Sequence, residues 1–145
     1  MPNDANPLGS IFGGRVMQLI DVAASISAFR HAHRNVVTAS VDSLEFRRPI
    51  RVGQLVVVRS WLNWVGKSSM EAQVEVFAEN PLTGERDRTS TAYLTIVAVD
   101  GDGRPCEVPP LDLESEDERR RFRQAEERRA QRLELRARHR EEEGA

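Results

Sequence analysis

The sequence has very little cysteine, no long apolar run and almost no net charge. Its 145 residues include a single cysteine, Cys106, so no internal disulfide can form. The longest aliphatic run covers residues 55–58, and the amino-terminal residues lack the basic start and apolar stretch of a signal peptide. These absences exclude a disulfide scaffold and a helical membrane protein. They predict a cytoplasmic protein that does not act at a membrane.

Charged residues are abundant, but their signs balance. The formal net charge is -2, and residues 1–111 and 112–145 are each close to neutral. A protein that grips a nucleic-acid backbone carries net positive charge on one face, so this balance argues against a nucleic-acid partner. A small anionic ligand is still compatible with it.

The first half of the chain predicts one helix followed by four strands. Residues 15–30 contain neither glycine nor proline and are so rich in apolar side chains that we expect a helix enclosed on most sides. Segments rich in β-branched residues, with turn-forming flanks, predict strands at 36–46, 55–63, 68–77 and 88–99. Strict alternation in the third segment predicts an antiparallel sheet with one buried face. We therefore expect an α+β fold in which the sheet curls over the helix.

The composition changes abruptly after residue 110. Ser115 and Glu118 have the spacing of a capping box, with acidic residues in the first turn and arginine in later turns, so a charged helix is predicted from about residue 116. We therefore expect a domain at residues 1–111 and a helical tail at 112–145. Such a tail either packs weakly on the body or a neighbouring subunit, or serves as an RNA- or protein-binding arm. Three residue pairs have the spacing of surface ion pairs, namely Glu116 with Arg120, Asp117 with Arg121, and Glu134 with Arg138.

Three patterns resemble ligand motifs but lack required residues. Residues 66–68 resemble the end of a phosphate-binding Walker A loop, yet Trp61 occupies the position of its first glycine. Residues 100–103 resemble a calcium loop, but a leucine stands where the closing glutamate belongs, so we expect a turn. His31 and His33 have no accompanying cysteine or second histidine cluster, and we expect no metal site.

Asp21 stands in the middle of the apolar helix, where a carboxylate is costly unless it is paired, hydrogen-bonded or used in chemistry. Gly13 and Gly14 at the helix start would expose backbone N–H groups suited to a carbonyl oxygen that gains negative charge. Asp21 lies about 12 Å beyond Gly13 along the helix axis, too far to attack a carbonyl held there. Two antiparallel helices in a twofold dimer would bring Gly13 of one chain to Asp21 of the other.

The run from Asp4 to Asp21 has the pattern Asp-x-Asn-x-x-Gly-x-Ile-Phe-Gly-Gly-x-x-Met-x-x-x-Asp. This pattern resembles the opening of hotdog-fold acyl-CoA thioesterases of the brain acyl-CoA hydrolase and YciA type. The resemblance covers roughly residues 2–110, through segments 36–42, 46–53, 65–69, 92–100 and 103–105. Members of that family usually carry a strand ahead of this pattern. We therefore expect either a start that is assigned too late or a sheet with one strand fewer.

The resemblance implies a hotdog fold, in which an antiparallel sheet wraps a long central helix, assembled into homodimers and further into hexamers. It implies hydrolysis of fatty acyl-CoA to free fatty acid and CoA, without a cofactor because CoA is part of the substrate. Asp21 resembles the catalytic carboxylate, acting as general base or as nucleophile. Asn6 resembles a polar partner from the opposite subunit, and Gly13 with Gly14 resembles the oxyanion donor.

Further positions are candidates for binding CoA. The turn formed by Gly66, Lys67, Ser68 and Ser69 resembles the family's loop near the CoA phosphates. Four arginines are unranked candidates for binding the same phosphates, namely Arg47, Arg48, Arg51 and Arg104.

Two other functions are compatible with a hotdog fold. A dehydratase would need a histidine paired with a carboxylate, and no histidine precedes the helix. A non-catalytic acyl-CoA-binding sensor or scaffold is the remaining alternative. Asp21 argues against it, because a binder has no need of a buried carboxylate facing a thioester.

Overall fold

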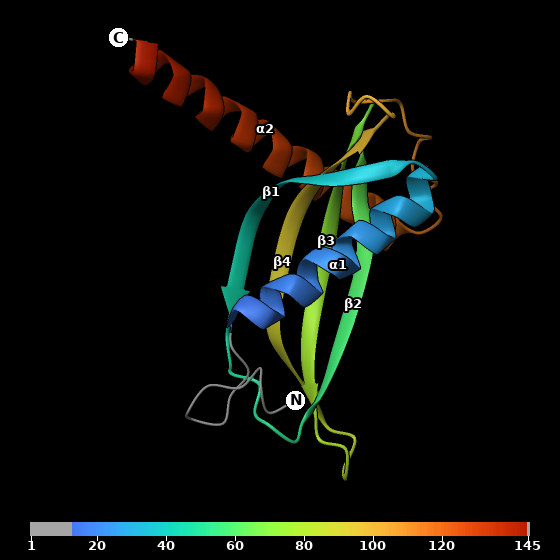
Figure 1. The fold of residues 1–145 in the computed structure, drawn as a ribbon, viewed down its shortest axis with the longest axis vertical. Coiled ribbons are helices and arrows are strands. Elements are labelled where there is room, and N and C mark those ends of the chain that lie inside the picture. Colours follow the sequence, from blue (N-terminus) through green and yellow to red (C-terminus); the bar gives the residue numbers. More distant parts are fainter. Residues whose placement is uncertain (1–12, 145) are drawn as a thin grey trace. The chain divides into compact units, whose positions relative to one another are not determined.

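The computed structural model describes residues 13–144, and the chain falls into two compact units, Met1–Pro110 and Leu111–Ala145. The order of elements in the first unit is one helix and four strands, as predicted (Figure 1). The second unit contains one long helix. The elements are α1 (Gly13–Ala32), β1 (Asn35–Phe46), β2 (Leu55–Val65), β3 (Ser69–Glu79), β4 (Arg86–Val99) and α2 (Glu116–Gly144).

The four strands form one antiparallel sheet in the order β1-β4-β3-β2, and α1 lies across one face of it (Figure 1). Alternate residues of β3 are fully buried, from Met70 through Val74 to Val76, which confirms the predicted period of two. Ile20 and Ala24 of α1 are also fully buried. The core of the first unit therefore combines one face of α1 with one face of the sheet, which confirms the predicted α+β hotdog architecture.

One face of α1 is exposed. Burial recurs at every fourth residue of the helix, in a single strip made of Val16, Ile20, Ala24, Ala28 and Ala32. On the opposite side, Val22, Ile26 and Phe29 are 56%, 52% and 52% exposed. The prediction of a helix enclosed on most sides is therefore wrong for a single chain, because one sheet covers only one face of a cylinder.

Helix α2 has the predicted amino-terminal cap. Ser115 Oγ accepts a hydrogen bond from the backbone N–H of Glu118 at 3.1 Å, while the Glu118 carboxylate accepts one from the backbone N–H of Glu114 at 3.2 Å. Together these bonds satisfy two backbone donors at the helix start. Over residues 13–144, neither helix has both the length and the apolarity needed to cross a bilayer.

Ion pairs run along the surface of α2. Arg138 Nη2 contacts Glu134 Oε1 at 2.6 Å, which confirms one predicted pair. Glu116 pairs with Arg119 and Arg123, at 3.3 and 3.4 Å, rather than with the arginine four residues on. Hydrogen bonds from these two guanidinium groups lower the pKa of Glu116 below its usual value. A second acidic residue of the first turn, Asp117, contacts Arg120 at 3.1 Å.

The segment at residues 100–103 is a turn, as predicted. Asp100 Oδ1 accepts hydrogen bonds from the backbone N–H groups of Asp102 and Arg104, at 2.9 and 3.0 Å. Gly103 adopts a positive φ of 77°, a conformation that glycine takes at little steric cost. Asp100 Oδ1 therefore shapes a reverse turn.

Candidate active site

Asp21 lies in the third turn of α1, partly buried at the boundary between the helix and β1. Thr38 Oγ1 of β1 donates a hydrogen bond to Asp21 Oδ1 at 2.6 Å. This short bond fixes one carboxylate oxygen and leaves Oδ2 available for other partners. Sequence reasoning missed Thr38. The only signal for it was its place inside the segment 36–42 that carries the family resemblance.

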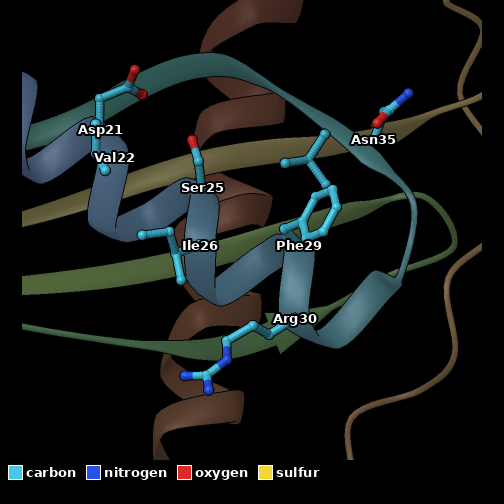
Figure 2. A pocket seen from close by; sticks show the side chains of 8 residues that line it. Asp21, Val22, Ser25, Ile26, Phe29, Arg30 and Asn35 are labelled. Carbon is cyan, nitrogen blue, oxygen red and sulfur yellow. The ribbon is translucent and has the colours of Figure 1, made fainter.

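A groove of about 500 Å³ begins at Asp21 and follows the exposed side of α1 (Figure 2). Its lining is mainly apolar, with a few polar and charged groups. The lining residues are Asp21, Val22, Ser25, Ile26, Phe29 and Arg30 of α1 with Asn35 and Val36 of β1. An apolar groove with a carboxylate at one end is suited to an extended ligand that carries a reactive polar group.

Gly13 and Gly14 begin α1, so their backbone N–H groups lie at the positive end of the helix dipole, as expected for an anion site. Gly13 lines a separate hollow of about 300 Å³, together with Phe46 and Arg48 among others. The structure therefore does not bring Gly13 and Asp21 together within one chain. Asn6, the remaining predicted catalytic residue, lies outside the residues that the structure describes.

The predicted CoA-binding turn links β2 to β3. The N–H of Gly66 donates to the carbonyl of Ser69 at 2.8 Å, and the carbonyls of Lys67 and Ser68 accept from Val108 and Ala98, each at 2.9 Å. A Cβ added to Gly66 would collide with the indole ring of Trp64. The turn is thus held by backbone contacts and close packing, and the Lys67 side chain is exposed.

Two of the four candidate arginines are paired with carboxylates. Arg47 contacts Glu45 at 3.3 Å and Arg48 contacts Asp87 at 3.5 Å, each pair well exposed. Because these pairs are exposed to solvent, they are weak and do not prevent the arginines from contacting a ligand. Among residues 13–144, no three histidine, cysteine, aspartate or glutamate side chains gather as they would around a metal ion.

Comparison with protein families finds a match to the thioesterase superfamily over residues 8–85. The Bacillus subtilis protein named uncharacterized acyl-CoA thioester hydrolase YkhA is 47% identical over 117 residues, which are 81% of this chain and 68% of that protein. The rat cytosolic acyl coenzyme A thioester hydrolase is 37% identical over 123 residues, which are 83% of this chain but only 32% of the rat protein.

Solved structures of similar proteins share the fold along most of the chain. An apo-hexameric acyl-CoA thioesterase is 41% identical with a TM-score of 0.90, covering 94% of this chain and 88% of its own. The acyl-CoA hydrolase of Staphylococcus aureus, in complex with butyryl coenzyme A, coenzyme A and coenzyme A disulfide, is 34% identical with a TM-score of 0.88. That match covers 97% of this chain and 86% of the other.

Proposed function

Since this chain belongs to the thioesterase superfamily, we propose that it hydrolyses fatty acyl-CoA to free fatty acid and CoA, at composite sites shared by two copies of the chain. The observation that carries the proposal is the Asp21 carboxylate, oriented by Thr38 at the head of an apolar groove. CoA enters as part of the substrate, and the reaction needs only water as co-substrate. The name of the rat relative supports a cytoplasmic location.

Asp21 supplies the chemistry at the thioester carbonyl. Thr38 holds Oδ1, which leaves Oδ2 to act on the substrate, where it takes a proton from an attacking water or attacks the carbonyl itself. In the first route, water adds to the carbonyl carbon, the tetrahedral intermediate collapses, and the CoA thiolate leaves and takes up the proton. In the second, an acyl-aspartyl anhydride forms with loss of the thiolate, and water then hydrolyses it.

Gly13 and Gly14 of the second copy stabilise the negative charge that develops on the carbonyl oxygen, and Asn6 of that copy orients the substrate or the water. The stabilisation by one backbone donor at such a site is worth about 3 kcal/mol of activation free energy. Gly66, Lys67, Ser68 and Ser69 contact the CoA phosphates. The hexameric relative supports an assembly built from such dimers. Residues 1–111 form the thioesterase domain and residues 112–145 the charged tail.

Mutants of the Staphylococcus aureus relative support the choice of catalytic residues. Structures of that hydrolase were solved with an asparagine, an aspartate or a threonine replaced by alanine. The three substituted positions are spaced along that chain as Asn6, Asp21 and Thr38 are spaced here. A hexameric broad-specificity thioesterase was likewise solved as an aspartate-to-alanine mutant.

Release of free thiol from a panel of acyl-CoA esters, short to long, tests this function. We expect the wild type to turn over several esters and Asp21→Asn to be slower by about a hundredfold or more, because it loses the base or nucleophile. Asp102→Asn, in an exposed turn away from the groove, is the matched control and keeps full activity. The thiol of Cys106 is subtracted as a constant background.

Two results would contradict the proposal. An Asp21→Asn variant with wild-type turnover removes Asp21 from the mechanism. A wild-type protein that binds CoA but hydrolyses none of the esters makes the chain a sensor or scaffold.

A further inference from the structure

Strand β1 is irregular where it passes Asp21. Its pairing with β4 shifts by one residue at two positions, so Ala39 and Asp42 are extra residues without a partner of their own on β4. Each is a β-bulge, an insertion that bends its strand and re-aims the neighbouring side chains. Figure 1 shows β1 as a sharply bent strand. The face to which each side chain of this segment points therefore depends on the bulges.

The first bulge turns Thr38 and Ser40 to opposite faces of the sheet. In a regular strand, residues two positions apart point to the same face, and residues directly opposite each other in an antiparallel pair share a face. Thr38 pairs with Ile96, which is fully buried in the core beneath α1. Ser40 pairs with Thr95, the next residue along β4, on the outer face of the sheet, which is the face turned away from α1. The extra residue between them is what allows this change of face.

A carboxylate on the outer face holds the bulged segment in place. Asp42 Oδ1 accepts a hydrogen bond from Ser40 Oγ at 2.7 Å, and Asp42 Oδ2 accepts one from Thr95 Oγ1 at 2.6 Å. All three side chains are partly buried, and hydrogen bonds to a charged carboxylate are short and strong. Ser40 and Thr95 are the first pair after the bulge. One side chain thus fixes the register of β1 against β4 directly after the register changes.

The opposite face of the same backbone carries the hydroxyl that orients Asp21. Thr38 Oγ1 donates to Asp21 Oδ1 at 2.6 Å, and Thr38 immediately precedes the bulge. A slip of one residue in the pairing would turn Thr38 to the outer face and break that bond. Asp42 does not line the groove at Asp21. Its influence on that carboxylate therefore passes through the backbone of residues 39–41 and through Thr38.

The geometry points to Asp42 as a positioning residue for hydrolysis, which holds the first bulge of β1 so that Thr38 faces α1 and orients Asp21. The inference rests on the proposed function. It extends the contacts that fix the carboxylate across the sheet, from Thr95 through Asp42 and the bulge to Thr38. A residue with this role affects turnover rather than substrate binding, and it loses its effect once the Thr38 hydroxyl is removed.

A double-mutant cycle with Thr38 tests this role. We expect Asp42→Ala to lower kcat for acyl-CoA hydrolysis by about tenfold with KM nearly unchanged, because the Thr38 hydroxyl loses its fixed direction. In Thr38→Val that hydroxyl is already absent, so adding Asp42→Ala lowers kcat by less than about twofold more. Asp42→Asn keeps the shape and one acceptor oxygen and recovers most of kcat. Glu75→Ala, which removes the carboxylate partner of Arg88 on the same outer face, is the matched control and leaves kcat unchanged.

A second variant covers a loss of folding in Asp42→Ala. Thr95→Val keeps the shape of its side chain and removes one of the two donors to Asp42, and we expect a fall in kcat of about threefold. Three results would overturn the inference while leaving the proposed function intact. These are wild-type kcat in the variants of both residues, a rise in KM in place of a fall in kcat, and effects of Asp42→Ala and Thr38→Val that multiply. A fall in oligomer mass by light scattering would instead assign Asp42 to a subunit interface, and the positioning role would fail.

Hydrogen exchange tests the hold on the bulge without any turnover. If the wild type hydrolyses no ester, the proposed function fails, and exchange of the backbone amides of residues 36–42 then decides on Asp42. We expect these amides to exchange at least about tenfold faster in Asp42→Ala than in the wild type or in Glu75→Ala, because the register is no longer held. Equal exchange in all three proteins would show that Asp42 does not hold the bulge.

Discussion

At the scale of single residues, Asp21 was predictable from sequence because a carboxylate breaks the apolar pattern of its helix. Thr38 was not, because a threonine in a strand is ordinary, and only the packing of β1 against α1 reveals that its hydroxyl reaches the carboxylate.

Thr38 provides a prediction about positioning. Thr38→Val keeps the shape of the side chain and removes the donor to Asp21 Oδ1, so the carboxylate loses its fixed orientation. We expect kcat for acyl-CoA hydrolysis to fall by about tenfold, the size expected for one lost hydrogen bond to a charged group, with KM nearly unchanged. Thr38→Ser, which retains a hydroxyl, is the control and recovers most of kcat. Equal kcat for the valine and serine variants would show that the hydrogen bond plays no part in catalysis.

At the scale of elements, the sequence predicted every helix and strand of residues 13–144, since periodicity and turn residues are local signals. It did not predict which face of α1 stays exposed, because Ile20 and Ile26 are equally apolar and only the sheet distinguishes them. It also did not fully predict the partners along α2. Positions three, four and seven residues from Glu116 are all within reach of a long side chain, and the rotamers decide between them.

Glu116 provides a prediction about pH. Its pKa in the folded helix lies below its usual value of 4.5, chiefly because Arg119 and Arg123 donate hydrogen bonds to it. A lowered pKa means that these contacts stabilise the first turn of α2 fully above the usual value, and that the stabilisation is lost as the pH falls through the lowered pKa. We expect Cα chemical shifts of residues 116–123 to move toward unfolded values as acidification takes the pH below the usual pKa of 4.5 and through the lowered pKa of Glu116. Glu116→Gln should show weaker helical shifts already at pH 7 and a smaller change on acidification. Identical pH curves for both proteins would exclude Glu116 as the group responsible.

At the scale of the whole molecule, the distance between Gly13 and Asp21 is the strongest argument for assembly. About 12 Å of helix separates the expected oxyanion donor from the carboxylate, so the proposed site needs a second copy of the chain. Exposed apolar residues of β1 also favour the assembly of two copies of the chain. Val37 and Val41 of β1 are 50% and 41% exposed, and within residues 13–144 this strand pairs with β4 alone, so one of its edges is open to a second copy.

The last prediction tests assembly and catalysis together. Val41→Glu places a charge on β1 where the side chain is already partly exposed, so the single chain tolerates it while burial against a second copy becomes costly. We expect the mass in solution to fall to that of a monomer and thiol release to fall by about a hundredfold or more, because the oxyanion donors are separated from Asp21. Leu82→Glu, at a position 93% exposed in the turn between β3 and β4, is the matched control and keeps both the mass and the activity. A Val41→Glu monomer with full turnover would show that one chain suffices, and Gly13 would then have to be replaced as the oxyanion donor by a group close to Asp21 on the same chain.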